Sequence, residues 1–326
     1  MLSSRKKNRN KTDPTPTAMQ AVVIEEFGGL DVLRVKTVAV PQPSHEEVLV
    51  RVAAVGINPV DWKTRGGAGV AQQVGGMPFI LGWDIAGTVE QQGRRVTMFE
   101  PGDRVMGMVN FPGGGGGYAE FVVASDTQLV KVPDRISLRE AAALPLVALT
   151  AWQALFDSAA VKSGDRVLVH AAAGGVGHVA VQLAKWKGAY VIGTASPHNH
   201  EFARSLGCDE VYAYGGDDPW TRIEDVKAVI DTVGGETRAL SLKKLSRSGT
   251  LVTLVTGDSK AGLNSPTRVK KILVKPNQRQ LEQIAGLLAD GTLKVHTTVV
   301  NGLRNLAEAH SLSETRRVRG KIVVTL

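Results

Sequence analysis

The residues with the clearest chemical potential form a glycine-rich turn near the middle of the chain. An apolar, strand-like segment at 166–170 runs into Ala172-x-Gly174-x-x-Gly177, and a helical run follows. Glycines at this spacing let the backbone approach a pyrophosphate closely, and the N-terminus of the following helix attracts its negative charge. The spacing therefore predicts a phosphate-binding turn, which comprises Gly174, Gly175, Val176 and Gly177.

The sequence around this turn predicts a complete dinucleotide-binding unit. Apolar residues recur at helical spacing after the turn, Gly188 ends the helix, and a second strand follows at 190–194. A strand, turn, helix and strand within about 30 residues is typical of dinucleotide binding. A merely tight turn in an unrelated α/β domain is the alternative interpretation.

The loop after the second strand predicts which dinucleotide binds. NAD-binding proteins usually place an acidic residue about 20 residues beyond the turn, against the ribose hydroxyls. Here residues 195–197 are Ala-Ser-Pro, so no carboxylate repels a 2′-phosphate. Ser196, His198 and His200 offer donors to one, and we expect NADPH (NADP) as the cofactor. The alternative is that the two histidines are solvated loop residues.

Two patterns of elements divide the chain. Strand-like segments separated by turns predict a compact, partly barrel-like β domain; they lie at 19–25, 48–56, 85–90, 104–109 and 121–124. From about Ala141 strands alternate with helices, which predicts an α/β, doubly wound parallel sheet; its strands lie at 166–170, 190–194, 210–214, 226–231 and 250–255. Helices at 278–289 and 303–314 and a strand at 321–326 follow. The five glycines at 113–117 predict a mobile loop.

Composition places the chain among globular proteins and excludes several site types. Of 326 residues, 43% are hydrophobic and 21% charged, and Cys208 is the one cysteine. An intrachain disulfide framework and a cysteine-rich zinc site are therefore excluded. The sequence has no apolar run of about 18 residues and no apolar signal core. We expect a cytoplasmic protein with no membrane partner.

Half of the net charge of +8 lies in residues 1–18, which hold five basic side chains and Asp13. This polar segment predicts a disordered basic tail, and Met19 could be an alternative start. A basic arm that contacts RNA or an acidic membrane surface is one alternative, and a short targeting peptide is another. We expect no nucleic-acid partner.

Seven motifs, taken in order, resemble those of one family. They are GINPVDWKTR (56–65), GWDIAGTVE (82–90), PGDRV (101–105), GGYAEF (116–121), LPLVALTAWQAL (144–155), HAAAGGVG (170–177) and DTVGGE (231–236). Together they resemble the zinc-free quinone oxidoreductase-like branch of the medium-chain dehydrogenase/reductase superfamily, over residues 19–326. The resemblance implies a GroES-like, partly open β-barrel catalytic domain of residues 19–143 and 277–326. A Rossmann NADP-binding domain of residues 144–276 is inserted in it, the active site lies in the cleft, and the protein is a homodimer.

The chain departs from the zinc-dependent members of this superfamily. Asn58 stands where they carry a cysteine, and Gly82-Trp83-Asp84 replaces their Gly-His-Glu motif. A catalytic zinc needs about three protein ligands, so we expect no metal. Without a Lewis acid, the small-molecule acceptor of hydride must already be electron-poor, such as a quinone or an α,β-unsaturated aldehyde or ketone.

The resemblance also implies roles for single residues. Asn58 would lie beside nicotinamide and substrate, Thr150 near the nicotinamide, and Tyr214 against the adenosine. Five residues after two later strands would flank the ribose and carboxamide; they are Val233, Gly234, Leu254, Val255 and Thr256.

Lys63 and Tyr118 are further catalytic candidates. Lys63 could steady an enolate or quinol anion, or could be a surface residue or ion-pair partner of Asp61. Tyr118 could line the substrate mouth or serve packing. Three functional hypotheses remain: a quinone reductase, a reductase of the C=C bond of enals or enones, and a non-catalytic NADPH-binding protein that contacts RNA through its tail.

Overall fold

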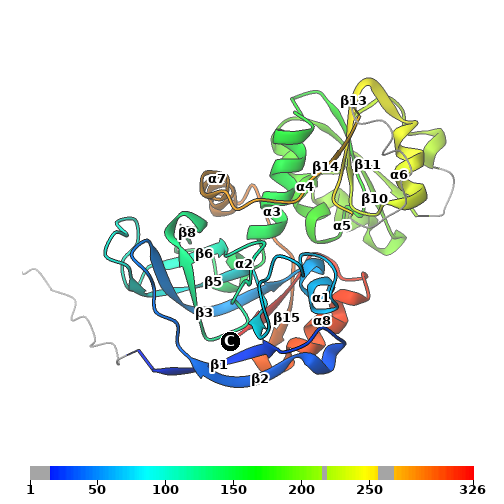
Figure 1. The fold of residues 1–326 in the computed structure, drawn as a ribbon. Coiled ribbons are helices and arrows are strands. Elements are labelled where there is room, and N and C mark those ends of the chain that lie inside the picture. The colour runs from blue at the N-terminus through cyan, green and yellow to red at the C-terminus, as the bar shows by residue number, and fades with distance from the viewer. Residues whose placement is uncertain (1–14, 215–218, 256–267) are drawn as a thin grey trace, which may run out of the picture.

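A computed structural model describes residues 15–214, 219–255 and 268–326, arranged in two domains (Figure 1). The strands of the first domain are β1 (Ala18–Ile24), β2 (Arg34–Ala39), β3 (Glu47–Ile57), β4 (Phe79–Ile80), β5 (Asp84–Gln92), β6 (Arg104–Met108), β7 (Phe121–Ser125), β8 (Leu129–Lys131), β15 (Thr297–Asn301) and β16 (Lys321–Thr325). Its helices are α1 (Pro59–Arg65), α2 (Leu138–Ala142), α7 (Gln278–Ala289) and α8 (Leu306–Glu314). A seven-stranded sheet follows the path β15-β16-β3-β5-β6-β8 with β7 also on β3, and a second sheet has the order β2-β1-β4.

The second domain is a parallel sheet with helices. Its strands are β9 (Arg166–Val169), β10 (Tyr190–Ala195), β11 (Glu210–Ala213), β12 (Val226–Asp231), β13 (Leu245–Thr253) and β14 (Val269–Lys271), and its helices are α3 (Pro145–Trp152), α4 (Gly175–Trp186), α5 (His200–Ser205) and α6 (Gly235–Leu242). The order β11-β10-β9-β12-β13-β14 reverses between β9 and β12, and all pairs are parallel. Ligands of such sheets bind at the carboxyl ends of the strands at this reversal. The predicted fold class is therefore confirmed.

The end of the chain returns to the first domain and touches the second. Strand β16 pairs with β3 in the first sheet. Just before β16, the N–H of Gly320 donates to the carbonyl oxygen of Ala173 (2.9 Å), within the glycine-rich turn. The last strand thus ties the barrel-type domain directly to the predicted phosphate site.

Two predictions concern irregular segments. The glycine run at 113–117 is held by hydrogen bonds, because Trp83 Nε1 donates to the carbonyl oxygen of Gly113 (2.8 Å) and Gly117 N–H donates to that of Gly82 (2.9 Å). A Cβ on Gly115 would lie 2.2 Å from the Gly82 oxygen, so these glycines allow close packing. Of the predicted tail at 1–18, Ala18 begins β1 and pairs with β2, and Thr15 and Thr17 form hydrogen bonds with Glu90 and Val40, whereas residues 1–14 lie outside the described chain.

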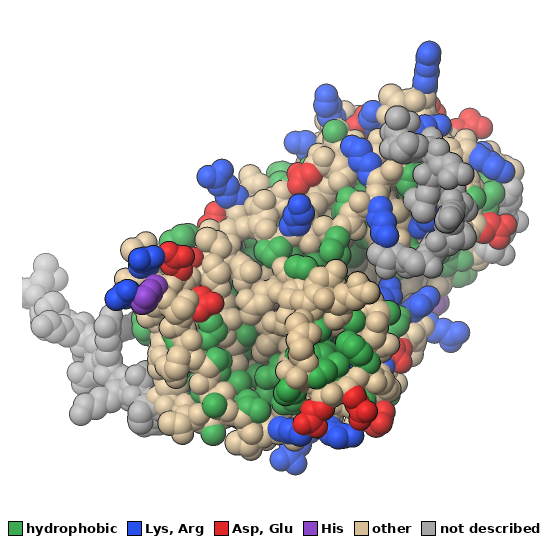
Figure 2. Space-filling model, in the orientation of Figure 1, with side chains coloured by type: hydrophobic (Ala, Val, Ile, Leu, Met, Phe, Trp, Pro, Cys, Tyr) green, Lys and Arg blue, Asp and Glu red, His purple; other side chains and the backbone are tan. Residues whose placement is uncertain are grey.

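The surface shows no single basic face in the view of Figure 2. Lys and Arg side chains are spread over both domains there, with Asp and Glu among them. Among the described residues, no helix has the length and apolar character needed to cross a bilayer.

Candidate active site

The predicted phosphate-binding turn lies at the carboxyl end of β9, where the strand order reverses. A Cβ on Gly177 would lie 2.0 Å from the carbonyl oxygen of Ala171, so glycine is needed for α4 to begin this close to the turn. Gly175 and Val176 form the first turn of α4, and no described side chain caps the helix at Gly174. The first N–H groups of α4 are therefore available to an anion, and these residues fit the pyrophosphate of a dinucleotide.

Asp231, the last residue of β12, orders the loop in which Val233 and Gly234 lie. One carboxylate oxygen accepts from the N–H of Val233 (3.1 Å) and of Gly234 (2.7 Å). The other accepts from Nε of Arg238 (2.7 Å), in an ion pair whose side chains are 2% and 0% exposed. A buried ion pair with further hydrogen bonds holds this loop in one shape.

Arg238 extends the same network to the neighbouring strand β13. Its Nη2 donates to Oγ1 of Thr253 (2.8 Å), which also accepts from the N–H of Val255 (3.2 Å). Leu254 and Val255 are therefore fixed beside the loop of β12, whereas Thr256 lies outside the described residues.

The loop after β10 carries the residues expected near the adenosine. Ser196 follows β10 directly and is half-buried, and His198 is exposed. The hydroxyl of Tyr214 donates to the carbonyl oxygen of Thr194 (3.2 Å), which places Tyr214 at the same strand end. His200 differs from the expectation, because its Nε2 donates to the carbonyl oxygen of Ala195 (3.2 Å) and the ring engages its own backbone.

A buried lysine that the sequence analysis missed lies beside the turn. Lys321 is 3% exposed, and its Nζ donates to the carbonyl oxygen of Ile57 (2.8 Å) and to Oδ1 of Asn58. It also lies 3.6 Å from Oδ2 of Asp84, which accepts from Nδ2 of Asn58 (2.9 Å). Burial raises the pKa of Asp84 and lowers that of Lys321, and the charge of each partner opposes the effect. Together, these contacts fix the orientation of the Asn58 amide.

This lysine bears on whether the site fits a zinc ion. By the resemblance, Asn58 stands where the zinc-dependent members carry a cysteine and Trp83 where they carry the histidine of Gly-His-Glu, and here Asn58 and the neighbouring Asp84 both engage the Lys321 ammonium. The described residues contain no cluster of three His, Cys, Asp or Glu side chains that could hold a metal. The donor set therefore does not fit a catalytic zinc.

A second buried network lies on the other side of Asn58. Asp61 Oδ2 accepts from the N–H of Asn58 (2.7 Å) and from the hydroxyl of Tyr118 (2.9 Å). Tyr118 also contacts Nε2 of His310 (2.9 Å), whose Nδ1 lies 3.2 Å from Nη1 of Arg65. Burial raises the pKa of Asp61 to about 7 and lowers that of His310 to about 3.

The direction of these hydrogen bonds follows from Arg65, which can only donate. His310 therefore accepts at Nδ1 and donates from Nε2 to Tyr118, and Tyr118 donates to Asp61. Because Arg65 keeps its protons, this series of hydrogen bonds cannot carry a proton from Asp61 to Arg65. It holds Asp61 in place and, through it, the backbone of Asn58.

The remaining predicted residues lie in three different settings. Tyr118 is fully buried, so its hydroxyl serves this network and does not line the cleft. Lys63 is half-buried, pairs with no acid among the described residues, and has Nζ 5.6 Å from the ring centre of Trp62. Burial, then the charge of Arg316, lowers its pKa. Thr150 is buried in α3, where its hydroxyl donates to the carbonyl oxygen of Leu146 (2.6 Å).

Cys208 is buried, as expected for a small packing residue. Burial raises the pKa of its thiol to about 12, which opposes a role as a nucleophile. Sequence signals for the missed residues existed. Lys321 is a charged residue at the start of an otherwise apolar strand, and Arg238 follows the DTVGGE motif.

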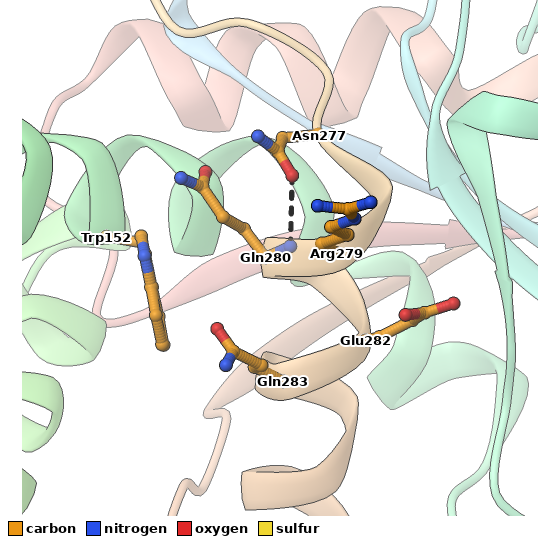
Figure 3. A pocket seen from close by; sticks show the side chains of 6 residues that line it. All are labelled: Trp152, Asn277, Arg279, Gln280, Glu282 and Gln283. Atoms are coloured by element: carbon orange, nitrogen blue, oxygen red, sulfur yellow. Dashed lines mark hydrogen bonds between the residues drawn. The ribbon is translucent and has the colours of Figure 1, made fainter.

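A polar hollow of about 660 Å³ lies away from these residues, between Trp152 of α3 and the start of α7 (Figure 3). Asn277 caps α7 there by accepting from the N–H of Gln280 (3.1 Å), and Arg279, Glu282 and Gln283 complete its lining. None of the predicted cofactor residues lines it, so it plays no part in the site described above.

Family models match both parts of the chain. The model described as "Alcohol dehydrogenase GroES-like domain" matches residues 44–134, and "Zinc-binding dehydrogenase" matches residues 206–324. A chloroplast envelope quinone oxidoreductase homolog of Arabidopsis thaliana is 34% identical over 91% of this chain and 95% of its own length. A quinone oxidoreductase of Mus musculus is 33% identical, over 90% and 93%.

Solved structures share the arrangement. A quinone oxidoreductase from Coxiella burnetii has a TM-score of 0.89 at 37% identity, covering 95% of this chain and 99% of its own. A mycobacterial protein in complex with NADPH has a TM-score of 0.82 at 31% identity, covering 94% of this chain and 100% of its own. The CurK enoyl reductase has a TM-score of 0.83 at 27% identity, covering 95% of this chain and 99% of its own. The chain therefore belongs to the quinone oxidoreductase-like branch of the medium-chain dehydrogenase/reductase superfamily, as its motifs indicated.

Proposed function

We propose that the protein is an NADPH-dependent, zinc-independent oxidoreductase that transfers hydride to a quinone-type acceptor. The observation that carries this proposal is the Lys321 ammonium bound by Asn58 and Asp84 beside the phosphate-binding turn. Asn58 replaces the cysteine of the zinc-dependent relatives and binds an organic cation, and Trp83 replaces their histidine, so the site lacks a Lewis acid for an alcohol or a simple carbonyl. An electron-poor acceptor needs no such activation.

The proposed cofactor site lies along the carboxyl ends of five neighbouring strands, β11, β10, β9, β12 and β13. NADPH, when bound, supplies the hydride. Gly174 to Gly177 would hold its pyrophosphate at the N-terminus of α4, which favours negative charge. Tyr214, Ser196 and His198 would contact the adenosine half. Val233, Gly234, Leu254 and Val255 would flank the nicotinamide half, with Thr256 beyond the described residues.

The chain's own chemistry at the acceptor is electrostatic. Lys63 is proposed to stabilise the oxyanion that forms on the acceptor, since it has no described acidic partner and lies on α1, the helix that Asn58 caps. Asn58 and Thr150 are proposed to position the nicotinamide. Tyr118 is proposed only to support Asn58 through Asp61. Substitution of Lys63 by methionine should lower kcat and leave the Kd of NADPH unchanged.

The relatives support the acceptor class. Two of them, at 33% and 34% identity, are called quinone oxidoreductases or homologues, and one solved neighbour binds NADPH. A second candidate function is reduction of the C=C bond of enals or enones, which the resemblance to the CurK enoyl reductase favours. Both reactions use the same cofactor and the same kind of anion stabilisation.

The test is NADPH oxidation by the purified chain with a small quinone and a short 2-alkenal in parallel, and with NADH as the control cofactor. Faster turnover with the quinone supports the first proposal, and turnover only with the alkenal moves the function to double-bond reduction. Tight NADPH binding without turnover of either acceptor contradicts both.

A cytoplasmic location is also a proposal, supported by the single, buried cysteine. One relative is named for the chloroplast envelope, so fractionation of expressing cells against organelle markers is the relevant test. Enrichment with an organelle marker would contradict it.

A further inference from the structure

An arginine of the first domain contacts the loop after β10 in the second domain, which holds Ser196 and His198. Arg319 lies between α8 and β16, and its Nε donates to Oδ1 of Asn199 (2.8 Å). Its Nη2 donates to the carbonyl oxygen of His198 (3.3 Å), and its guanidinium lies 4.9 Å from the ring centre of Phe202 on α5. The side chain is thus held against the loop that follows β10 by contacts on two sides.

Arg319 keeps unused donors at this position. A guanidinium has five N–H groups, and the contacts to Asn199 and His198 use two of them. In the described part of the chain, Nη1 has no hydrogen-bond partner. Arg319 is half-buried, so part of this positioned side chain is accessible. The N–H groups of a planar guanidinium form a fork whose geometry matches the oxygens of a phosphate group.

The same arginine sets the hydrogen-bonding state of its neighbours. Because Asn199 Oδ1 accepts from Arg319, its Nδ2 faces Nε2 of His198 (3.3 Å). An amide nitrogen only donates, so Nε2 of His198 accepts, and the proton of a neutral ring lies on Nδ1. The Nδ1–H of exposed His198 is therefore available as a further donor in the same loop as Ser196.

The loop after β10 has an arginine nearby and no acidic residue at the position of Ser196, which favours the binding of an anion. In dinucleotide folds an acid after the second strand binds the 2′-hydroxyl, whereas an arginine nearby accommodates a 2′-phosphate. Ser196 takes the place of the acid here. The nearest acid in sequence, Glu201, is exposed and forms no ion pair with Arg319 in the described chain.

We propose that Arg319, from the catalytic domain, completes the 2′-phosphate site across the cleft and is the residue that makes the protein prefer NADPH to NADH. The inference rests on the proposed nicotinamide-dependent function and deepens it. Specificity would then depend on both domains, because the loop alone offers only the hydroxyl of Ser196 and the ring of His198.

The test measures binding, so it needs no acceptor. The full chain is titrated with NADPH and with NADH by nicotinamide fluorescence, and NADPH is displaced by adenosine 2′,5′-bisphosphate. Arg319→Met should weaken NADPH and the bisphosphate at least about tenfold, as expected for loss of a charge-assisted hydrogen bond. NADH should change less than about twofold. Arg317→Met, at an exposed neighbouring arginine, is the matched control and should change none of the three.

A merely structural role predicts a different pattern, in which Arg319→Met weakens NADPH and NADH equally; that result would overturn the proposal. Should this variant fail to fold, Ser196→Asp decides, because it places a carboxylate in the site with Arg319 intact. It should abolish the preference for NADPH, and an unchanged preference contradicts the proposal. Equal binding of NADPH and NADH by the unmodified chain also contradicts it, even if acceptor reduction is found. Failure to reduce any acceptor affects only the proposed function.

Discussion

At the scale of single residues, the candidate site is organised by buried charges that compensate one another. Lys321 and Asp84 are 3% and 0% exposed, and each would be costly alone in that environment. Asn58 lies between them and donates to one while it accepts from the other. Removal of either charge alone leaves the other one buried without a partner. The cluster can therefore be tested by measuring the free energy of unfolding of variants.

Substitution of Lys321 by methionine leaves the Asp84 carboxylate buried without a counter-ion. We expect the free energy of unfolding to fall by about 3 to 5 kcal/mol in urea at neutral pH. The double variant Lys321→Met with Asp84→Asn should recover most of this loss, since no buried charge then remains. Lys36→Met, which removes an exposed ion pair with Glu25, is the control and should cost less than about 1 kcal/mol. A double variant as unstable as the single one would contradict the ion-pair account.

Asp61 predicts a specific dependence of stability on pH. Its pKa is about 7 in the folded chain, because of burial, and about 3.9 in an unfolded one. The folded state therefore holds this proton more tightly, so the contribution of Asp61 to unfolding free energy should fall as pH rises from about 4 to about 7, and stay level above that.

The variant Asp61→Asn isolates this contribution from that of His310. His310 acts in the opposite sense, since its pKa of about 3 makes the folded state lose stability as pH falls below about 6.5. It is present in both proteins and cancels in their difference. Urea unfolding of both proteins across this range is the measurement, and a difference that does not change with pH would show that Asp61 stays ionised.

At the scale of elements, the glycine turn and helix α4 are joined by backbone contact that leaves no room for a side chain at Gly177. Gly177→Ala should therefore destabilise the chain and weaken NADPH binding, as measured by urea unfolding and fluorescence titration. Gly286→Ala in α7 is the matched control, because no atom lies within 4 Å of a Cβ there. It should be neutral or stabilising by up to about 1 kcal/mol. Tight NADPH binding by Gly177→Ala would argue against the turn as the phosphate site.

Apolar periodicity in the sequence correctly predicted helices and strands whose ends are marked by neighbouring turn residues. The expected bounds of β12 and of α7 match the structure, as does the start of β9 at Arg166, because apolar periodicity and flanking turns define them. The short strand β14 was missed, since its three residues pair with a partner and carry no pattern of their own.

The site residues also fall into two groups, those that are close in sequence and those that meet only in the fold. The turn could be read from the sequence because its glycines are contiguous. The contacts of Lys321 with Asn58, and of Arg319 with Asn199, join residues 263 and 120 positions apart. No spacing rule connects such distant positions, so only the folded chain reveals them. For the same reason the sequence left open whether Tyr118 lines the substrate mouth or serves packing, and its contact with Asp61, 57 positions away, is visible only in the folded chain.

At the scale of the whole molecule, β14 is the last strand of the parallel sheet in the described part of the chain. In the described chain β14 pairs only with β13, and Leu273 just beyond it is 52% exposed. Such an edge can pair with another chain, which supports the proposed homodimer. Light scattering should give twice the chain mass of 34.6 kDa. Leu273→Asp should shift the protein toward monomer, and a monomeric unmodified chain at micromolar concentration would contradict the proposal.

We propose that the protein transfers hydride from NADPH without a metal, at a site where buried Lys321 orients Asn58. The most direct test compares the initial rate of NADPH oxidation by a small quinone before and after exhaustive treatment with a chelator. We predict that the rate is unchanged, and that it exceeds the rate with NADH. Loss of activity on chelation with recovery on adding zinc, or no oxidation of NADPH at all, would contradict the account.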